Sequence, residues 1–107
     1  MSTFDKREQG FESKFAHDEE LRFKANARRN KLLGLWAAGL LGYEGDKAEE
    51  YAKEVVRSDF EEPGDEDVFR KIRADFDSNN VEQSDHQIRR TMDELMATAI
   101  QQLQNDG

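Results

Sequence analysis

The sequence contains no cysteine, a single proline and no long apolar run. The absence of cysteine excludes disulfides, thiolate metal sites and thiol nucleophiles. No apolar stretch approaches the roughly 20 residues that a transmembrane helix needs, and the charged residues 1–20 do not resemble a signal peptide. No segment alternates between apolar and polar residues over the length of a strand, so a β-sheet is not expected. We therefore expect one small, cytoplasmic, helical domain, since 107 residues leave room for no more.

Charged residues are abundant, and the two signs are separated along the chain. They make up 37% of the sequence, with a formal net charge of −8, which disfavours nucleic acid and anionic membranes as partners. Acids dominate residues 44–67, whereas every charged residue between positions 22 and 31 is basic. The basic residues are Arg22, Lys24, Arg28, Arg29 and Lys31. This separation suits docking on a protein surface of mixed charge, although it is equally consistent with two segments that face each other or water.

Residues that start and stop helices divide the chain into four helical segments. The stop signals are a glycine, a Pro-Gly pair and an asparagine pair, at Gly42, Pro63-Gly64 and Asn79-Asn80. Two start signals are also present. Asp46, followed by Glu49, predicts an N-cap, and Ser84, followed by Gln87, predicts a capping box.

Within each segment apolar residues recur at intervals of three and four, so each predicted helix has one apolar face. In the first helix this face consists of Leu21, Ala25, Leu32, Leu35, Trp36 and Leu40. Trp36 shares its stripe with Leu32 and Leu40, which predicts that the only tryptophan is buried in the core. The corresponding residues of the later helices are Tyr51, Ala52, Val55 and Val56; Val68, Phe69, Ile72 and Phe76; and Ile88, Met92, Leu95, Met96, Ala99 and Leu103. Short connections favour antiparallel neighbours. The predicted fold class is all-α, a small four-helix bundle over residues 21–107.

Residues 1–20 fit this bundle less well and form a predicted N-terminal arm. Phe4, Phe11 and Phe15 share one helical face, but Gly10 weakens the helix by about 1 kcal/mol relative to alanine. Because an isolated helix this short is marginal in water, we expect the arm to be partly disordered in the free protein and to fold in a partner's groove. The periodicity alone is also consistent with three phenylalanines that complete the bundle core.

No residue pattern indicates catalysis or metal binding. His17 and His86 have no cysteine partner and stand in different predicted helices. The segment from Asp75 begins like a calcium-binding loop, but Asn80 and His86 occupy the positions that require glycine and glutamate. The glycines lack the strand and the lysine of a phosphate-binding loop. We expect no enzyme activity, no metal and no required cofactor, while the basic run beside Trp36 is a candidate for weak ATP or ADP binding through charge and ring stacking.

Several strings of the sequence are distinctive. Residues 15–24 read FAHDEELRFK and residues 27–38 read ARRNKLLGLWAA. Five shorter strings follow: YAKEVV at 51–56, DFEE at 59–62, DVFRK at 67–71, HQIRR at 86–90 and MDEL at 92–95. Together they extend over essentially the whole chain and resemble the alphaproteobacterial zeta-subunit family of F-type ATPase inhibitors.

The resemblance implies a four-helix regulatory subunit of the ATP synthase, peripheral to the inner membrane through that enzyme; we expect a monomer when it is free. In this family the N-terminal segment inhibits ATP hydrolysis by inserting between the catalytic head and the rotor. Mapped onto this chain, the inhibitory residues are Phe4, Asp5, Arg7, Glu8, Phe11, Glu12, Lys14 and Phe15. The chain departs from the family pattern at Lys6 and Gly10, where an acid and an alanine are usual, and both changes weaken or re-charge the arm.

Two other classes of function remain open at this stage. A helical adaptor of another bacterial assembly would have the same bundle and arm, with weak or no inhibitory activity. An adenine-nucleotide-sensing module would instead use the basic run and Trp36 as its binding surface. The resemblance favours the inhibitor and makes the three phenylalanines of the arm anchors in a partner.

Overall fold

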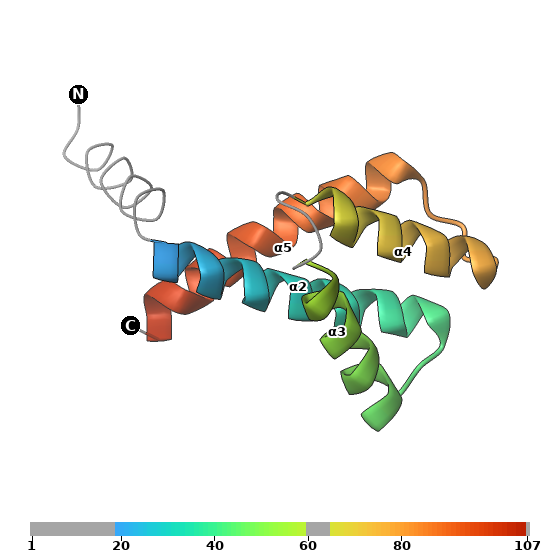
Figure 1. The fold of residues 1–107 in the computed structure, drawn as a ribbon, viewed down its shortest axis with the longest axis horizontal. Helices are drawn as coiled ribbons and strands as arrows, with labels where there is room; N and C mark the ends of the chain where they lie inside the picture. Colours follow the sequence, from blue (N-terminus) through green and yellow to red (C-terminus); the bar gives the residue numbers. More distant parts are fainter. Residues whose placement is uncertain (1–18, 60–64, 107) are drawn as a thin grey trace.

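Four helices and no strand are found in residues 19–59 and 65–106, the ranges that the computed structural model describes. They are α2 (Glu19–Leu41), α3 (Asp46–Ser58), α4 (Glu66–Ser78) and α5 (Asp85–Asp106) (Figure 1). The prediction of an all-α, four-helix fold is therefore confirmed. The predicted arm lies outside the described residues, apart from its last two positions, which form the start of α2.

The two long helices, α2 and α5, run antiparallel and contact each other along the molecule (Figure 1). The shorter helices α3 and α4 pack at the end where α2 finishes and α5 begins, and they also contact each other. The first turn of α2 and the last turn of α5 lie together at the opposite end (Figure 1). Residues that precede Glu19 are therefore attached far from α3 and α4.

The core combines fully buried side chains from all four helices. Its largest aliphatic and aromatic members include Leu33, Val55, Ile72, Phe76 and Ile88, each 0% exposed. Val55, Ile72, Phe76 and Ile88 come from the predicted apolar faces of α3, α4 and α5, so these three faces are confirmed.

The buried face of α2 differs from the predicted one. Leu33, Ala37 and Ala38 are 0% exposed, whereas Leu40 is 41% exposed. Trp36 is partly buried, and its ring packs edge-on against Phe76 with 5.7 Å between the ring centroids. The predicted face is therefore correct at Ala25, which is 3% exposed, and wrong at Leu40, whereas Trp36 is only partly buried and packs at the edge of the core.

A close approach of two helices explains the face that α2 buries. A Cβ atom added at Gly34 would lie 2.6 Å from the Ala52 Cα atom of α3. Contact between backbones at this distance is possible only where the side chains are very small. Gly34, Ala37 and Ala38 share the α2 face that meets the bundle, and the bulkier Trp36 is left at its edge.

Two helices end in the left-handed residue that the sequence predicts. Gly42 has a φ of +83°, and the next amide, of Tyr43, donates to the Ala38 carbonyl at 2.8 Å. Asn80 has a φ of +59°, and the amide that follows it makes the equivalent bond at 2.9 Å. Both are Schellman ends, in which backbone amides beyond the helix satisfy its last carbonyls. The helix ends at Gly42 and Asn80 are confirmed.

One of the two predicted N-caps is correct. The Gln87 amide donates to Ser84 Oγ at 3.1 Å, and the Ser84 amide donates to Gln87 Oε1 at 2.8 Å, as a capping box requires. Asp46 is the first residue of α3 rather than its cap. The cap is Gly45, with a φ of +57° and no side chain to accept a hydrogen bond. The predicted stop at Pro63-Gly64 lies outside the described residues.

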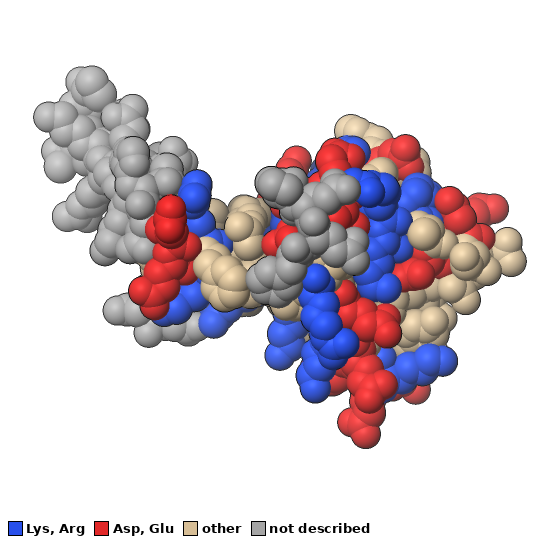
Figure 2. All heavy atoms as spheres, in the orientation of Figure 1, with Lys and Arg blue, Asp and Glu red and all other residues tan. Residues whose placement is uncertain are grey.

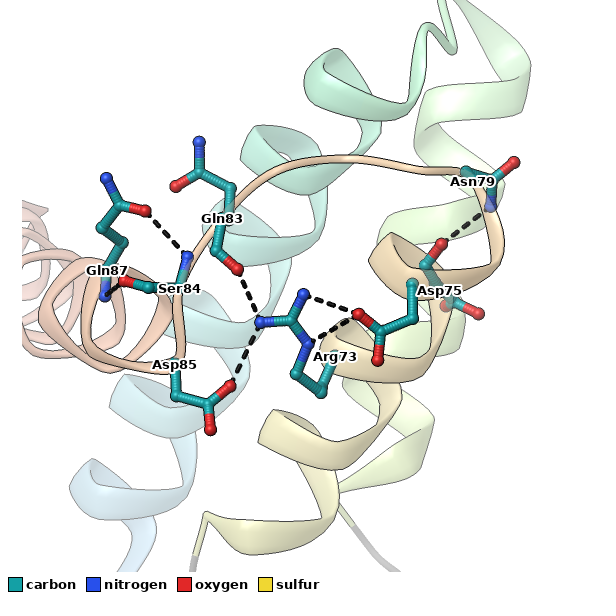
Figure 3. Close-up of polar contacts among 8 residues, drawn as sticks. Arg73, Asp75, Asn79, Gln83, Ser84, Asp85 and Gln87 are labelled. Atoms are coloured by element: carbon teal, nitrogen blue, oxygen red, sulfur yellow. Dashed lines mark hydrogen bonds and ion pairs between the residues drawn. The ribbon is translucent and has the colours of Figure 1, made fainter.

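The turn between α4 and α5 is held by Arg73 (Figure 3). Its guanidinium group donates to the Gln83 carbonyl at 2.6 Å. It also forms ion pairs with Asp77 at 2.8 Å and with Asp85 at 3.1 Å. These contacts join the last turn of α4 to the first turn of α5. They therefore fix the start of α5, with its capping box, relative to α4.

Candidate functional site

The predicted inhibitory residues, from Phe4 to Phe15, all lie outside the described residues. The described part of the chain nearest to them in the sequence is the first turn of α2, to which they are attached. The other predicted contact residues, the basic run of α2, lie within the described helix.

The basic run does not form one continuous exposed face. Arg22, Lys24 and Lys31 are exposed, whereas Arg28 is partly buried and Arg29 is only 2% exposed. Lys24 forms an ion pair one turn back with Glu20 at 3.2 Å. The run therefore divides into residues that face solvent and a residue that belongs to the fold.

Arg29 connects α2 to the start of α4. Its Nη2 atom lies 2.8 Å from Asp65 Oδ1, and its Nε atom donates to Asn30 Oδ1 at 2.7 Å. A buried guanidinium that has both partners is stable, and the loss of either partner would leave a costly uncompensated group. Arg29 is therefore engaged within the bundle rather than presented to a partner or a nucleotide.

An exposed groove runs between α2 and α3. Its volume is about 300 Å³. Val56 is partly exposed within it, and Ala52 lies at its base, directly beside the close approach to Gly34. Longer, charged side chains surround these two apolar residues. The complete lining is Lys31, Glu49, Ala52, Lys53, Val56 and Arg57.

The three basic residues of this groove are free of internal partners. No ion pair or side-chain hydrogen bond with a described residue is formed by Lys31, Lys53 or Arg57. Figure 2 shows basic side chains gathered over α3 on the face turned to the viewer. Lys53 and Arg57 are not evident in the sequence as binding residues, because acids dominate residues 44–67. The available signal was their spacing of four residues, which places them on one helical face.

A second, smaller pocket of about 190 Å³ adjoins this groove and shares Val56 with it. Phe23 stands at its rim and is 57% exposed. The Asn30 amide nitrogen is buried here and faces Asp59 without a well-formed hydrogen bond. Burial raises the pKa of the Asp59 carboxyl, although Asn30 and the charge of Arg29 act in the opposite direction. The apolar surface therefore continues from Val56 to Phe23 beside an incompletely satisfied polar pair.

On the opposite side of α3, Glu54 of α3 and Asp75 of α4 are engaged within the fold. Tyr51 donates its hydroxyl hydrogen to Asp75 Oδ2 at 2.7 Å, and Lys71 lies 3.1 Å from the same oxygen. Lys71 also pairs with Glu54 at 3.4 Å. Burial, together with the hydrogen bond to Asp75, raises the pKa of the Tyr51 hydroxyl. This network joins α3 to α4, and it explains why Asp75 is a structural residue rather than the first ligand of a calcium loop.

Neither a metal site nor a membrane span is found in the described part of the chain. No group of three or more histidine and acidic residues within it is arranged to hold a metal ion. None of its helices combines the length and apolar character needed to cross a bilayer. The surface features on which function can be argued are therefore the arm's attachment point and the α2–α3 groove.

Comparison with known proteins identifies the family of this chain. The family model for ATPase inhibitor subunit zeta matches residues 1–102. The chain belongs to the zeta inhibitor family. A protein whose structure was solved by solution NMR shares 48% sequence identity with this zeta chain and superposes with a TM-score of 0.73. The match covers 81% of the zeta chain and 99% of the NMR chain. No curated protein matches.

Membership of this family supports a regulatory role on an ATPase, which agrees with the resemblance found in the sequence. The match begins at residue 1, so it includes the segment that carries the predicted inhibitory residues. It also includes both sides of the α2–α3 groove, since Lys31 and Arg57 lie within the matched range.

Proposed function

We propose that this zeta chain inhibits ATP hydrolysis by the F-type ATP synthase by inserting its N-terminal segment between the catalytic head and the central rotor. The observation that carries the proposal is the family match, which extends over the whole of that segment. The proposed mechanism is steric. The chain contributes no chemical step and requires no cofactor.

The position of the attachment point supports this mechanism. Residues that precede Glu19 are joined to the bundle at the end remote from α3 and α4 (Figure 1). Phe4, Phe11 and Phe15 would supply the apolar contact, and each ring is worth about 1.5–3 kcal/mol when it is fully buried. The charged residues between them would form the rim of the interface, where they favour correct orientation more than affinity.

ATP hydrolysis by the cognate enzyme, measured with increasing amounts of the full chain, tests the proposal. The variant Phe4→Ala/Phe11→Ala/Phe15→Ala should inhibit at least about a hundredfold more weakly, because each 1.4 kcal/mol corresponds to about a factor of ten. Its thermal midpoint should be unchanged if the three phenylalanines act as anchors in the partner and not as part of the bundle core. The same loss is expected after deletion of residues 1–14.

A matched control comes from the same segment. Ser2, Gln9 and Ser13 fall on the helical face opposite to the three phenylalanines, and their replacement by alanine should leave inhibition intact. Undiminished inhibition by the phenylalanine variant would move the inhibitory surface to the bundle. A large fall in its thermal midpoint would instead assign the phenylalanines to the bundle core.

A further inference from the structure

We infer that the groove between α2 and α3 is a second docking site, whose occupant is an acidic amphipathic segment of the partner protein. This inference rests on the proposed function, because the partner in question is the ATPase head. It assigns a binding role to Lys31, Lys53 and Arg57, none of which belongs to the N-terminal arm.

The charge of the groove is the first observation. Within residues 19–59 and 65–106, the side chains of only four Lys or Arg residues make no contact with a neighbouring acid, hydrogen-bond acceptor or ring, and three of the four line this groove. The fourth is Arg22, near the start of α2. In a chain with a net charge of −8, acids are available to pair with every cation. With three cations and one acid, Glu49, in its lining, the groove has an excess of two positive charges, and the resulting positive potential attracts an acidic partner.

The shape of the groove indicates a protein segment rather than a small anion. Lys53 and Arg57 lie one helical turn apart on α3, and Lys31 stands opposite them on α2. The groove is also lined by Val56 and Ala52 of α3, which give it an apolar part. An amphipathic helix would place an apolar side chain over Val56 and carboxylates one turn apart against Lys53 and Arg57.

The adjoining pocket extends this surface in a way that also favours a peptide chain. Val56 is common to both cavities, and Phe23 continues the apolar strip along α2. A small anion would make no contact with this apolar strip, whereas the apolar side chains of an amphipathic segment would.

The test is binding of the full-length chain to the purified ATPase head at low and moderate salt. The variant Lys53→Glu/Arg57→Glu should bind about tenfold more weakly or worse at low salt, because it replaces attraction by repulsion. The salt dependence of its binding should also become shallower. Arg22→Glu is the control, since it reverses an exposed cation that lies outside the groove and has no partner among the described residues. It should change the affinity by less than about twofold. Thermal midpoints should match that of the wild type, since these side chains have no partners within the described fold.

Site-specific cross-linking identifies the occupant. A photoreactive side chain at Val56 should join the chain to a segment of the head that carries an apolar residue flanked by acids. Unchanged affinity and salt dependence in the groove variant would overturn the inference. A cross-link to a segment without acids, no cross-link at all, or an equal loss of affinity in Arg22→Glu would also overturn it.

The same assays separate this inference from the proposed function. If the phenylalanine variant of the arm still inhibits fully while the groove variant binds weakly, the insertion mechanism fails and the groove remains a docking site. If the arm variant loses inhibition while the groove variant binds normally, the insertion mechanism stands and the groove is not a docking site.

Discussion

The contact between Gly34 and Ala52 predicts that a single added methyl group will separate α2 from α3. In Gly34→Ala the new Cβ atom would lie 2.6 Å from Ala52 Cα, 3.1 Å from Ala52 Cβ and 3.3 Å from Val55 Cβ. The nearest of these atoms belongs to the backbone of a helix, so it cannot rotate away as the end of a long side chain would. The two helices must therefore move apart, which loosens the packing of Leu33 and Val55 in the core.

The magnitude follows from two opposing terms. Overpacking a well-packed core costs up to about 3 kcal/mol, and a clash with backbone belongs at the upper end of that range. Replacing glycine by alanine within a helix returns about 1 kcal/mol. We expect a net loss of about 2 kcal/mol in the free energy of unfolding, which corresponds to a decrease of roughly 8–16 °C in the thermal midpoint of a domain this small.

Gly39→Ala provides the matched comparison in urea or thermal unfolding. Gly39 lies in the same helix, and nothing stands within 4 Å of an added Cβ atom there. This variant should gain about 0.5–1 kcal/mol, because only the helix-propensity term remains. Equal stability of the two variants would show that α2 and α3 do not meet at Gly34, and the geometry of the adjoining groove would then also be wrong.

Two further predictions concern the cap of α5 and the partly buried carboxyl of Asp59, which directly follows α3. Ser84→Ala removes one half of the capping box and should lower the free energy of unfolding, measured by urea denaturation, by about 0.5–2 kcal/mol. Ser78→Ala, in the last turn of α4, is the comparison and should have a smaller effect. Folding raises the pKa of Asp59, so the penalty for its ionised form is absent at low pH and grows as pH rises through the folded pKa. Asp59→Asn should therefore be more stable than the wild type near neutral pH, and this difference should vanish as pH falls below about 3.9; a difference independent of pH would refute the assignment.

Features that depend on neighbouring residues were determined by the sequence alone. Gly42 and Asn80 end their helices because both tolerate the left-handed conformation, and Ser84 with Gln87 begins one because their side chains reach the free amides of the same turn. The apolar faces of α3, α4 and α5 were equally clear, since each is bordered by charged residues. The family was recognisable from strings such as ARRNKLLGLWAA at residues 27–38.

Features that depend on contacts between distant residues were decided only by the tertiary structure. Residues 32–41 of α2 are apolar or small almost all round, so periodicity did not distinguish the face of Leu33 from that of Trp36. The choice depends on how closely α2 can approach α3 at Gly34, which depends on Ala52. Arg29 reads as part of a basic run, but Asp65 draws it into the fold from 36 residues away. Lys31 likewise joins Lys53 and Arg57 only because α2 and α3 cross there, and sequence spacing carries no information about which helix faces meet.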